Sequence, residues 1–394
     1  MHNNIDELNM SEQEITVSEL SLWSKDSYTL VDVRDEISYS YGHLPEAVNI
    51  SLEQLENSWS EFSETKLVVY CKKGEASAET VKLLREKGIE AYNLTGGYIA
   101  WLMDTMQQEQ RNDKDVYNTF CEDVEKSLRK RFHKKIWSRF TKAINEYELV
   151  KQGDSIAVCI SGGKDSMLLA KLFQELKRHN KFDFEVQFLV MDPGYSPENR
   201  RVIENNAKKL NIPITVFESD IFDSVFHVEK SPCYLCARMR RGHLYSKARE
   251  LGCNKIALGH HYDDVIETIL MGMLYGGQVQ TMMPKLHSTN FEGMELIRPL
   301  YLIREDDIKA WRDANNLYFI QCACKFTDTC SSCQDDGQSN SKRLEVKKLI
   351  QELKKTNPFV EKNIFKSVEN VNLSTVIAYK KDGVKHHFLE DYDV

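Results

Sequence analysis

The sequence predicts an α/β protein made of two successive modules, each with a parallel β-sheet. Short apolar runs rich in β-branched residues alternate with amphipathic helical stretches along both halves of the 394-residue chain. Each half also places a loop that can carry chemistry between a buried strand and a helix, at Cys71 and at residues 161–166. Between the halves, the polar segment 104–118 interrupts the alternation and predicts a linker.

The expected elements follow from apolar runs and glycines. In the first module, residues 30–33 and 67–70 are predicted strands, and residues 76–87 a helix closed by Gly88. The second module opens with a strand at 156–160, a glycine turn at 161–165 and a helix at 166–178, and further strands are predicted at 185–191, 214–217 and 255–259. Such repeated βα units predict a doubly wound parallel sheet with its ligand site at the carboxyl ends of the strands.

We divide the chain into four segments. The first module occupies residues 11–105 and the linker residues 106–121. The second module occupies residues 122–345, beginning with a long helix predicted at 122–149, and a C-terminal tail occupies residues 346–394.

Composition narrows the class of protein. The mean hydropathy is −0.48, and no apolar run approaches the roughly 20 residues of a membrane-spanning helix. The N-terminal segment lacks the basic stretch and apolar block of a signal peptide, so we expect a cytoplasmic protein without membrane contact. In a reducing compartment, the ten cysteines are not expected to form a disulfide framework.

Charge is unevenly distributed along the chain. Residues 1–110 hold 8 Lys and Arg against 20 Asp and Glu, whereas the remainder holds 44 against 40. The segment 126–142 (KSLRKRFHKKIWSRFTK) has eight Lys or Arg and no acid, and Phe132, Trp137 and Phe140 interleave with them. A solvated helix face is the alternative, but this pattern favours nucleic-acid contact. The expected contacts are Arg129, Lys130, Arg131, Lys134 and Lys135.

Cys71 follows an apolar run and opens the loop CKKGEAS before a predicted helix. Backbone N–H groups and the positive end of the helix dipole would stabilise a thiolate or persulfide there. The blocks VDVR, GHLPEAVNI, the Cys71 loop and LTGGYIAW stand in the order found in rhodanese domains, which the first module resembles. The resemblance implies a Cys71 persulfide that passes sulfur onward. Glu75 and Ala76 replace the arginine common near the end of that loop, which favours a relay to the neighbouring module over free thiosulfate chemistry.

The loop SGGKDS follows the strand IAVCI, where glycines let backbone N–H groups approach an anion beside a helix N-terminus. It resembles the PP-loop of ATP pyrophosphatases, which cleave ATP to AMP and pyrophosphate while adenylating a substrate. The resemblance implies an ATP site at Ser161, Gly162, Gly163, Lys164, Asp165 and Ser166. Lys164 would neutralise the leaving pyrophosphate, and Asp165 would help with Mg²⁺ or with loop structure.

Two further motifs carry chemistry. In GHHYDDVIET, paired carboxylates suit Mg²⁺ or activation of a nucleophile, and we expect Asp264 to be catalytic rather than a helix cap. In SPCYLCARMRRGHLY, Cys233 and Cys236 fall in the first turn of a predicted helix, as a redox pair or as ligands of zinc or an iron–sulfur cluster. The adjacent bases Arg238, Arg240 and Arg241 are expected to contact a phosphate backbone.

Together with GMLYGGQ, MMPKL and IRPLYLIRE, these motifs resemble those of tRNA 2-thiocytidine synthetases over residues 122–324. The resemblance implies a 4Fe–4S cluster held by three cysteines, with one iron open to carry sulfide. Cys233 and Cys236 match directly, and the third ligand is expected at Cys322. Because this chain has CAC where the family has CxxC, Cys324 competes with Cys322.

The leading hypothesis is an ATP-dependent enzyme that thiolates tRNA, at C2 of an anticodon-loop cytidine, with sulfur relayed from Cys71. Its cofactors would be ATP, Mg²⁺ and the cluster, and its partners tRNA and an upstream persulfide donor such as a cysteine desulfurase. A homodimer is left open. One alternative changes the substrate to a uridine or a small molecule. Another is a non-catalytic RNA-binding protein with a zinc site at Cys233, Cys236, Cys330 and Cys333.

Overall fold

The computed structural model describes residues 13–58, 66–110, 114–179, 182–219, 221, 232–319, 342–390 and 392. The chain forms two compact units. The first comprises Met1–His261 with Pro284–Ser339 and contains both α/β modules; the second comprises Tyr262–Met283 with Asn340–Val394. None of the described helices is long and apolar enough to cross a membrane.

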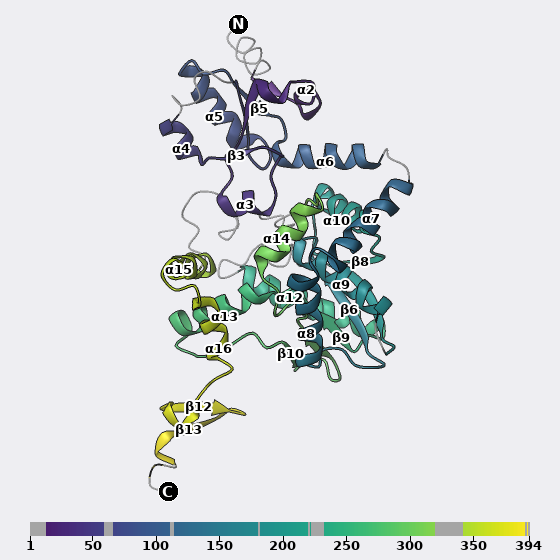
Figure 1. The fold of residues 1–394 in the computed structure, drawn as a ribbon, viewed down its shortest axis with the longest axis vertical. Coiled ribbons are helices and arrows are strands. Elements are labelled where there is room, and N and C mark those ends of the chain that lie inside the picture. The colour runs from purple at the N-terminus through teal and green to yellow at the C-terminus, as the bar shows by residue number, and fades with distance from the viewer. Residues whose placement is uncertain are drawn as a thin grey trace. The chain divides into compact units, whose positions relative to one another are not determined.

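The N-terminal module is a five-stranded, all-parallel sheet with strand order β1-β5-β4-β2-β3 (Figure 1). Its strands are β1 (Glu14–Ile15), β2 (Tyr28–Asp32), β3 (Val48–Asn49), β4 (Lys66–Tyr70) and β5 (Ala91–Leu94). Its helices are α2 (Val17–Leu20), α3 (Glu36–Tyr41), α4 (Leu52–Ser58), α5 (Glu75–Glu86) and α6 (Gly97–Gln110).

The second sheet has strand order β10-β11-β9-β6-β7-β8, and all its pairs are parallel except β10 with β11. The strands are β6 (Ser155–Ile160), β7 (Glu185–Asp192), β8 (Ile214–Glu218), β9 (Lys255–Ala257), β10 (Lys285–His287) and β11 (Glu295–Ile297). The helices of this module are α7 (Lys114–Arg129), α8 (Ser138–Glu146), α9 (Lys164–His179), α10 (Pro197–Lys209), α12 (Pro232–Glu250) and α14 (Glu305–Ala314). The predicted α/β class with two parallel sheets is confirmed.

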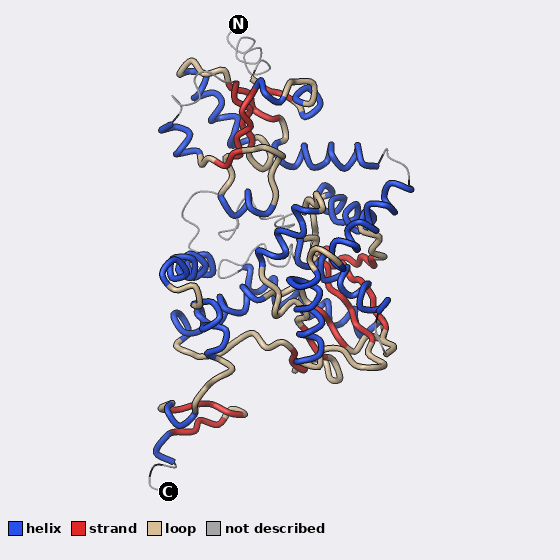
Figure 2. The backbone as a smooth tube through the Cα atoms, in the orientation of Figure 1, coloured by secondary structure: helices blue, strands red, loops and turns tan. Residues whose placement is uncertain are grey.

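Successive side chains of β6 point to opposite faces of this sheet, and both faces are buried because helices cover both. Ile156, Val158 and Ile160 belong to the large core that includes α9, whereas Ala157 and Cys159 pack with residues of α12. Figure 2 shows the strands of this sheet with helices around them. Strand β6 lies between β7 and β9, so the strands that follow β6 in the chain are added first on one side of it and then on the other. The carboxyl ends of β6 and β9 therefore meet where ligands bind in such sheets.

The predicted single helix at 122–149 is wrong in its extent. Helix α7 already begins at Lys114, and a π-helical turn at His133–Trp137 separates it from α8. The N–H of Trp137 donates to the carbonyl of Phe132, five residues back. This extra residue per turn keeps Phe132, Ile136 and Phe140 on the buried side. Helices also occupy much of the segment expected to be a linker, since α6 runs to Gln110.

The second unit packs helix α13 (Tyr262–Gly276) against α15 (Lys342–Thr356) and α16 (Val360–Ser367). The ring of Tyr262 stacks on Phe365, with centroids 4.5 Å apart. An antiparallel hairpin of β12 (Ala378–Lys381) and β13 (Val384–His387) follows.

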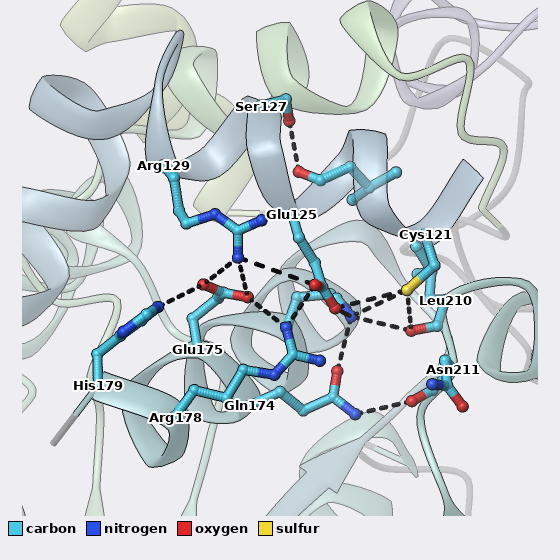
Figure 3. Close-up of polar contacts among 12 residues, drawn as sticks. Cys121, Glu125, Ser127, Arg129, Gln174, Glu175, Arg178, His179, Leu210 and Asn211 are labelled. Carbon is cyan, nitrogen blue, oxygen red and sulfur yellow. Dashed lines mark hydrogen bonds and ion pairs between the residues drawn. The ribbon is translucent and has the colours of Figure 1, made fainter. Parts of the chain in front are cut away.

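A buried charged cluster joins α7 to α9 (Figure 3). Lys171 is fully buried, and its ammonium lies 2.8 Å from a carboxylate oxygen of Glu125. Glu125 also pairs with Arg178, and Glu175 pairs with Arg129 at 3.0 Å. Burial would raise the pKa of Glu125, but Arg178 and Lys171 outweigh it and lower this pKa to about 2.

Replacing Glu125 with Gln should lower the free energy of unfolding by about 3 kcal/mol at pH 7, because Lys171 loses its buried counter-charge. A lowered folded-state pKa stabilises the protein above the unfolded pKa of about 4.3, and this contribution declines as pH falls toward 2. The cost of Glu125→Gln should therefore be roughly 0.6 kcal/mol smaller at pH 4, measured by urea unfolding. Exposed Glu122→Gln on the same helix is the control, and an equal cost for Glu125→Gln at both pH values would contradict the assignment.

Candidate active site

The loop at residues 161–163 joins the end of β6 to the start of α9, so it lies at the predicted end of the sheet. Gly162 has φ = 87°, a conformation that residues with a Cβ rarely adopt. Ser166 organises the loop: its Oγ accepts the N–H of Ser161 at 3.2 Å and donates to the carbonyl of Gly163 at 3.0 Å. These two hydrogen bonds hold the loop in one conformation without the help of a ligand.

Lys164 is fully buried at the first position of α9. Its Nζ lies 3.1 Å from Asp165 and 3.2 Å from Glu305, which begins α14. Burial alone would lower the pKa of Lys164, but the negative charges of Asp165 and Glu305 outweigh it and raise that pKa above its ordinary value. The ammonium therefore stays protonated, as a group that stabilises phosphate charge must.

Asp165 is placed to serve a cation. Its Oδ1 is buried and accepts no hydrogen bond from a described residue, and Nε2 of His261 lies 3.9 Å from it. A carboxylate oxygen with unused lone pairs beside a phosphate loop suits Mg²⁺. The carboxyl end of β9 approaches the same loop: a Cβ at Gly259 would come within 3.2 Å of the N of Ser166.

Cys71 occupies the corresponding position in the first sheet, between β4 and α5. Its Sγ accepts the N–H of Gly74 at 3.1 Å and lies 3.3 Å from the hydroxyl of Ser77. The same hydroxyl also donates to Oδ1 of Asn93 at 2.7 Å, so its single proton is shared between Asn93 and the sulfur. The backbone at position 97 packs so closely against the loop that only glycine fits there, because a Cβ would lie 2.3 Å from the carbonyl oxygen of Cys71. The sulfur is thus cradled by donors that can stabilise an anion.

Asp264 lies in the second unit, on the first turn of α13. Its Oδ1 accepts a hydrogen bond from Arg343 of α15 at 2.7 Å, and the same guanidinium lies 3.3 Å from Glu267. A role for Asp264 in catalysis stays a prediction.

The expected metal ligands are described only in part. Cys233 and Cys236 lie in the first turn of α12, as predicted for their backbone. Cys322, Cys324, Cys330 and Cys333 lie outside the described residues. Within the described ranges, no three His, Cys, Asp or Glu side chains are grouped to hold a metal ion.

The basic segment is only partly available to a polyanion. Lys135 pairs with Asp307 at 3.2 Å, and Arg129 is tied to Glu175 and Glu125 (Figure 3). Lys130, Arg131 and Lys134 are exposed and form no ion pair with a described residue. Of the aromatic residues that interleave with these basic residues, Phe132 and Phe140 are buried in the core and Trp137 is half-buried.

On α12, Arg238 and Arg241 are exposed three residues apart, a spacing that places them on one helix face. Arg240 instead donates a hydrogen bond to the hydroxyl of Tyr195 at 3.3 Å. The exposed pair therefore remains compatible with a phosphate contact.

Three residues at these loops were not predicted from the sequence. Glu305 balances Lys164, Ser77 contacts Cys71, and the ring of Tyr41 from the first module lies 4.2 Å from Nζ of Lys164. Glu305 is the last residue of the motif IRPLYLIRE, whereas no sequence signal distinguishes Tyr41.

A sulfur-cradling loop and a phosphate loop in one unit define a protein with a rhodanese-like domain joined to a PP-loop domain. Family models for these domains match residues 16–104 and 132–325. The tRNA-cytidine(32) 2-sulfurtransferase of Anaeromyxobacter dehalogenans (strain 2CP-C) is 36% identical over 244 residues, covering 61% of this chain and 80% of the relative. That of Coxiella burnetii (strain RSA 493 / Nine Mile phase I) is 36% identical over 257 residues, covering 64% and 95%.

Among solved structures, the U34-tRNA thiolase NcsA from Methanococcus maripaludis with its 4Fe–4S cluster aligns with a TM-score of 0.47 and 21% identity, covering 59% of this chain and 76% of that chain. The chain belongs to the tRNA-cytidine(32) 2-sulfurtransferase family and is a PP-loop sulfurtransferase.

Replacing Lys164 with Met should slow pyrophosphate release from ATP by about 10²–10³, because the variant has no ammonium to stabilise the departing charge. Pyrophosphate can be followed with a coupled phosphatase assay. Lys171→Met, which removes another buried lysine of the same helix remote from the loop, controls for loss of fold. Pyrophosphate release at the parent rate by Lys164→Met would contradict the role given to this residue.

Proposed function

We propose that this protein replaces the C2 oxygen of a tRNA cytidine with sulfur, using ATP to activate the base. The observation that carries the proposal is the protonated, buried Lys164 at the phosphate loop in the same compact unit as the cradled sulfur of Cys71. The names of the curated relatives support cytidine as the base.

In the activation step, the base oxygen attacks the α-phosphorus of ATP and pyrophosphate leaves. Backbone N–H groups of Gly162 and Gly163 and the ammonium of Lys164 bind the leaving phosphates. Oδ1 of Asp165 binds the accompanying Mg²⁺, for which its free lone pairs are suited. Asp264 is proposed as a second catalytic carboxylate. In the following step a sulfur nucleophile attacks C2, and AMP departs with the former base oxygen.

Cys71 is proposed as the first sulfur carrier. A terminal persulfide sulfur on Cys71 bears negative charge, which the N–H of Gly74 and the hydroxyl of Ser77 can stabilise. An upstream persulfide donor, such as a cysteine desulfurase, would load it. Transfer of that sulfur to another thiolate returns Cys71 to its own thiolate and needs no oxidant or reductant.

A 4Fe–4S cluster is proposed on Cys233, Cys236 and Cys322, with Cys324 as the alternative to Cys322. The positions of Cys233 and Cys236 in the first turn of α12 fit thiolate ligation, because the helix dipole stabilises negative charge there. When bound, a cluster with three protein thiolates supplies one open iron position for sulfur.

Replacing Cys71 with Ser should slow tRNA thiolation supported by a persulfide donor at least tenfold, while thiolation driven by excess sulfide stays near the parent rate. The reason is that only the first route needs a sulfur carrier outside the PP-loop domain. Cys253→Ser, a buried cysteine packed away from Cys71, is the matched control. Thiolated nucleosides are measured after digestion of the tRNA; 2-thiouridine in place of 2-thiocytidine would contradict the proposed base, and equal loss with both sulfur sources would contradict the relay.

We propose that the tRNA contacts five exposed basic side chains, which are Lys130, Arg131, Lys134, Arg238 and Arg241. Arg129, Lys135 and Arg240 are proposed to contribute less, because each is engaged by another side chain.

Charge reversal by Arg131→Glu with Lys134→Glu should weaken tRNA binding and flatten its salt dependence. For each duplex phosphate that the protein no longer neutralises, the log–log slope should fall by about 0.9. Lys82→Glu on helix α5 with Lys87→Glu at its C-cap is the matched double reversal and should change binding little. Filter binding between roughly 50 and 200 mM salt measures both quantities. Unchanged affinity and slope would identify the segment as a solvated helix face.

A further inference from the structure

Nζ of Lys164 is enclosed on every side. An ammonium has three N–H donors. Asp165 lies 3.1 Å from the nitrogen and Glu305 3.2 Å from it, and the ring centroid of Tyr41 lies 4.2 Å from it. The side chain of Lys164 has no exposed surface, so a phosphate can reach Nζ only if a group that covers the ammonium moves.

Tyr41 belongs to the other domain, at the last position of α3. Arg312 of α14 donates from Nη1 to the carbonyl of Ser40 at 2.7 Å and also to that of Tyr41. Arg34 of the rhodanese-like domain donates to the next carbonyl, that of Gly42, at 2.7 Å. Carbonyls at a helix C-terminus lack intrahelical partners, and here arginines from both domains satisfy them.

Helix α14 connects these contacts. Glu305 in its first turn holds Lys164, and Arg312, two turns later on the same face, holds the end of α3. Helix α14 therefore both pairs with Lys164, through Glu305, and binds the backbone of Tyr41, through Arg312.

We propose that Tyr41 is a gate on the ATP site: the phosphates of ATP and the docked α3 segment compete for Lys164. This inference rests on the proposed function for the identity of the nucleotide. Asp165 and Glu305 belong to the PP-loop domain and supply the charge that keeps a buried ammonium protonated. The Tyr41 ring makes a cation–π contact from helix α3 of the other domain and brings no carboxylate to the ammonium, so we take it as the cover that leaves.

The test measures binding of α,β-methylene-ATP with Mg²⁺ to the full chain by calorimetry. Tyr41→Ala should bind the analogue about three- to tenfold more tightly than the parent, because the competing contact is gone. Tyr41→Phe keeps the ring and should match the parent. Arg312→Met, which releases the α3 carbonyls, should tighten binding in the same direction as Tyr41→Ala. Thermal unfolding of each variant checks the fold.

Hydrogen exchange provides a second readout on the parent protein. The N–H of Gly42 donates to the carbonyl of Tyr39, and adding the analogue should speed exchange over residues 39–43 as the segment undocks. Unchanged or weaker nucleotide binding by Tyr41→Ala, or slower exchange at 39–43, would overturn the gate. Tight binding by Tyr41→Phe would overturn the role of the ring. If the binding pattern holds but no variant or parent thiolates tRNA, the proposed function fails while the gate stands.

Discussion

The burial of Lys164 is the constraint on which the arrangement of the first unit depends. An ammonium without solvent costs several kcal/mol unless carboxylates surround it. Asp165 and Glu305 meet that requirement, which fixes the start of α9 against the start of α14. Because α14 also carries Arg312, the same requirement positions the end of α3 in the rhodanese-like domain. One charge thus connects the phosphate loop, a helix of the PP-loop domain and a helix of the rhodanese-like domain.

The two reactive loops use the same local design with different chemistry. Each follows a buried parallel strand and precedes a helix, so backbone N–H groups converge on the anion that it holds. In the phosphate loop, Ser166 ties the chain together and Lys164 supplies a full positive charge. In the sulfur loop, Gly74 and Ser77 supply uncharged donors. The donors of the sulfur loop are therefore uncharged, whereas the phosphate loop carries a full positive charge.

Local features could be predicted from the sequence, and contacts between distant segments could not. The strands β4, β6 and β7 and the loops after β4 and β6 were identified because apolar runs and glycines mark them locally. The pairing of Lys164 with Glu305 depends on how α14 packs, which no local pattern encodes. The basic segment illustrates the same limit: it has no acid of its own, yet Glu175 and Asp307 from other helices neutralise part of it. Its aromatic residues follow the spacing of a buried face, and the π-helical turn keeps them there.

Joining donor and acceptor in one chain raises their effective concentration, but only if both can reach the reaction centre. The two α/β domains share a continuous apolar core that includes Leu102 and Met106 of α6 and Val124 and Leu128 of α7. Within this core the domains cannot drift apart freely, so the smaller contacts around Tyr41 and Arg312 are the ones that can open without unfolding the unit. If the contact at α3 opens as proposed, the apolar core that α6 and α7 share would still hold the Cys71 loop and the phosphate loop in one unit. The proposed steps of activation and sulfur delivery would then be ordered within one chain, whereas two separate proteins would depend on repeated encounter.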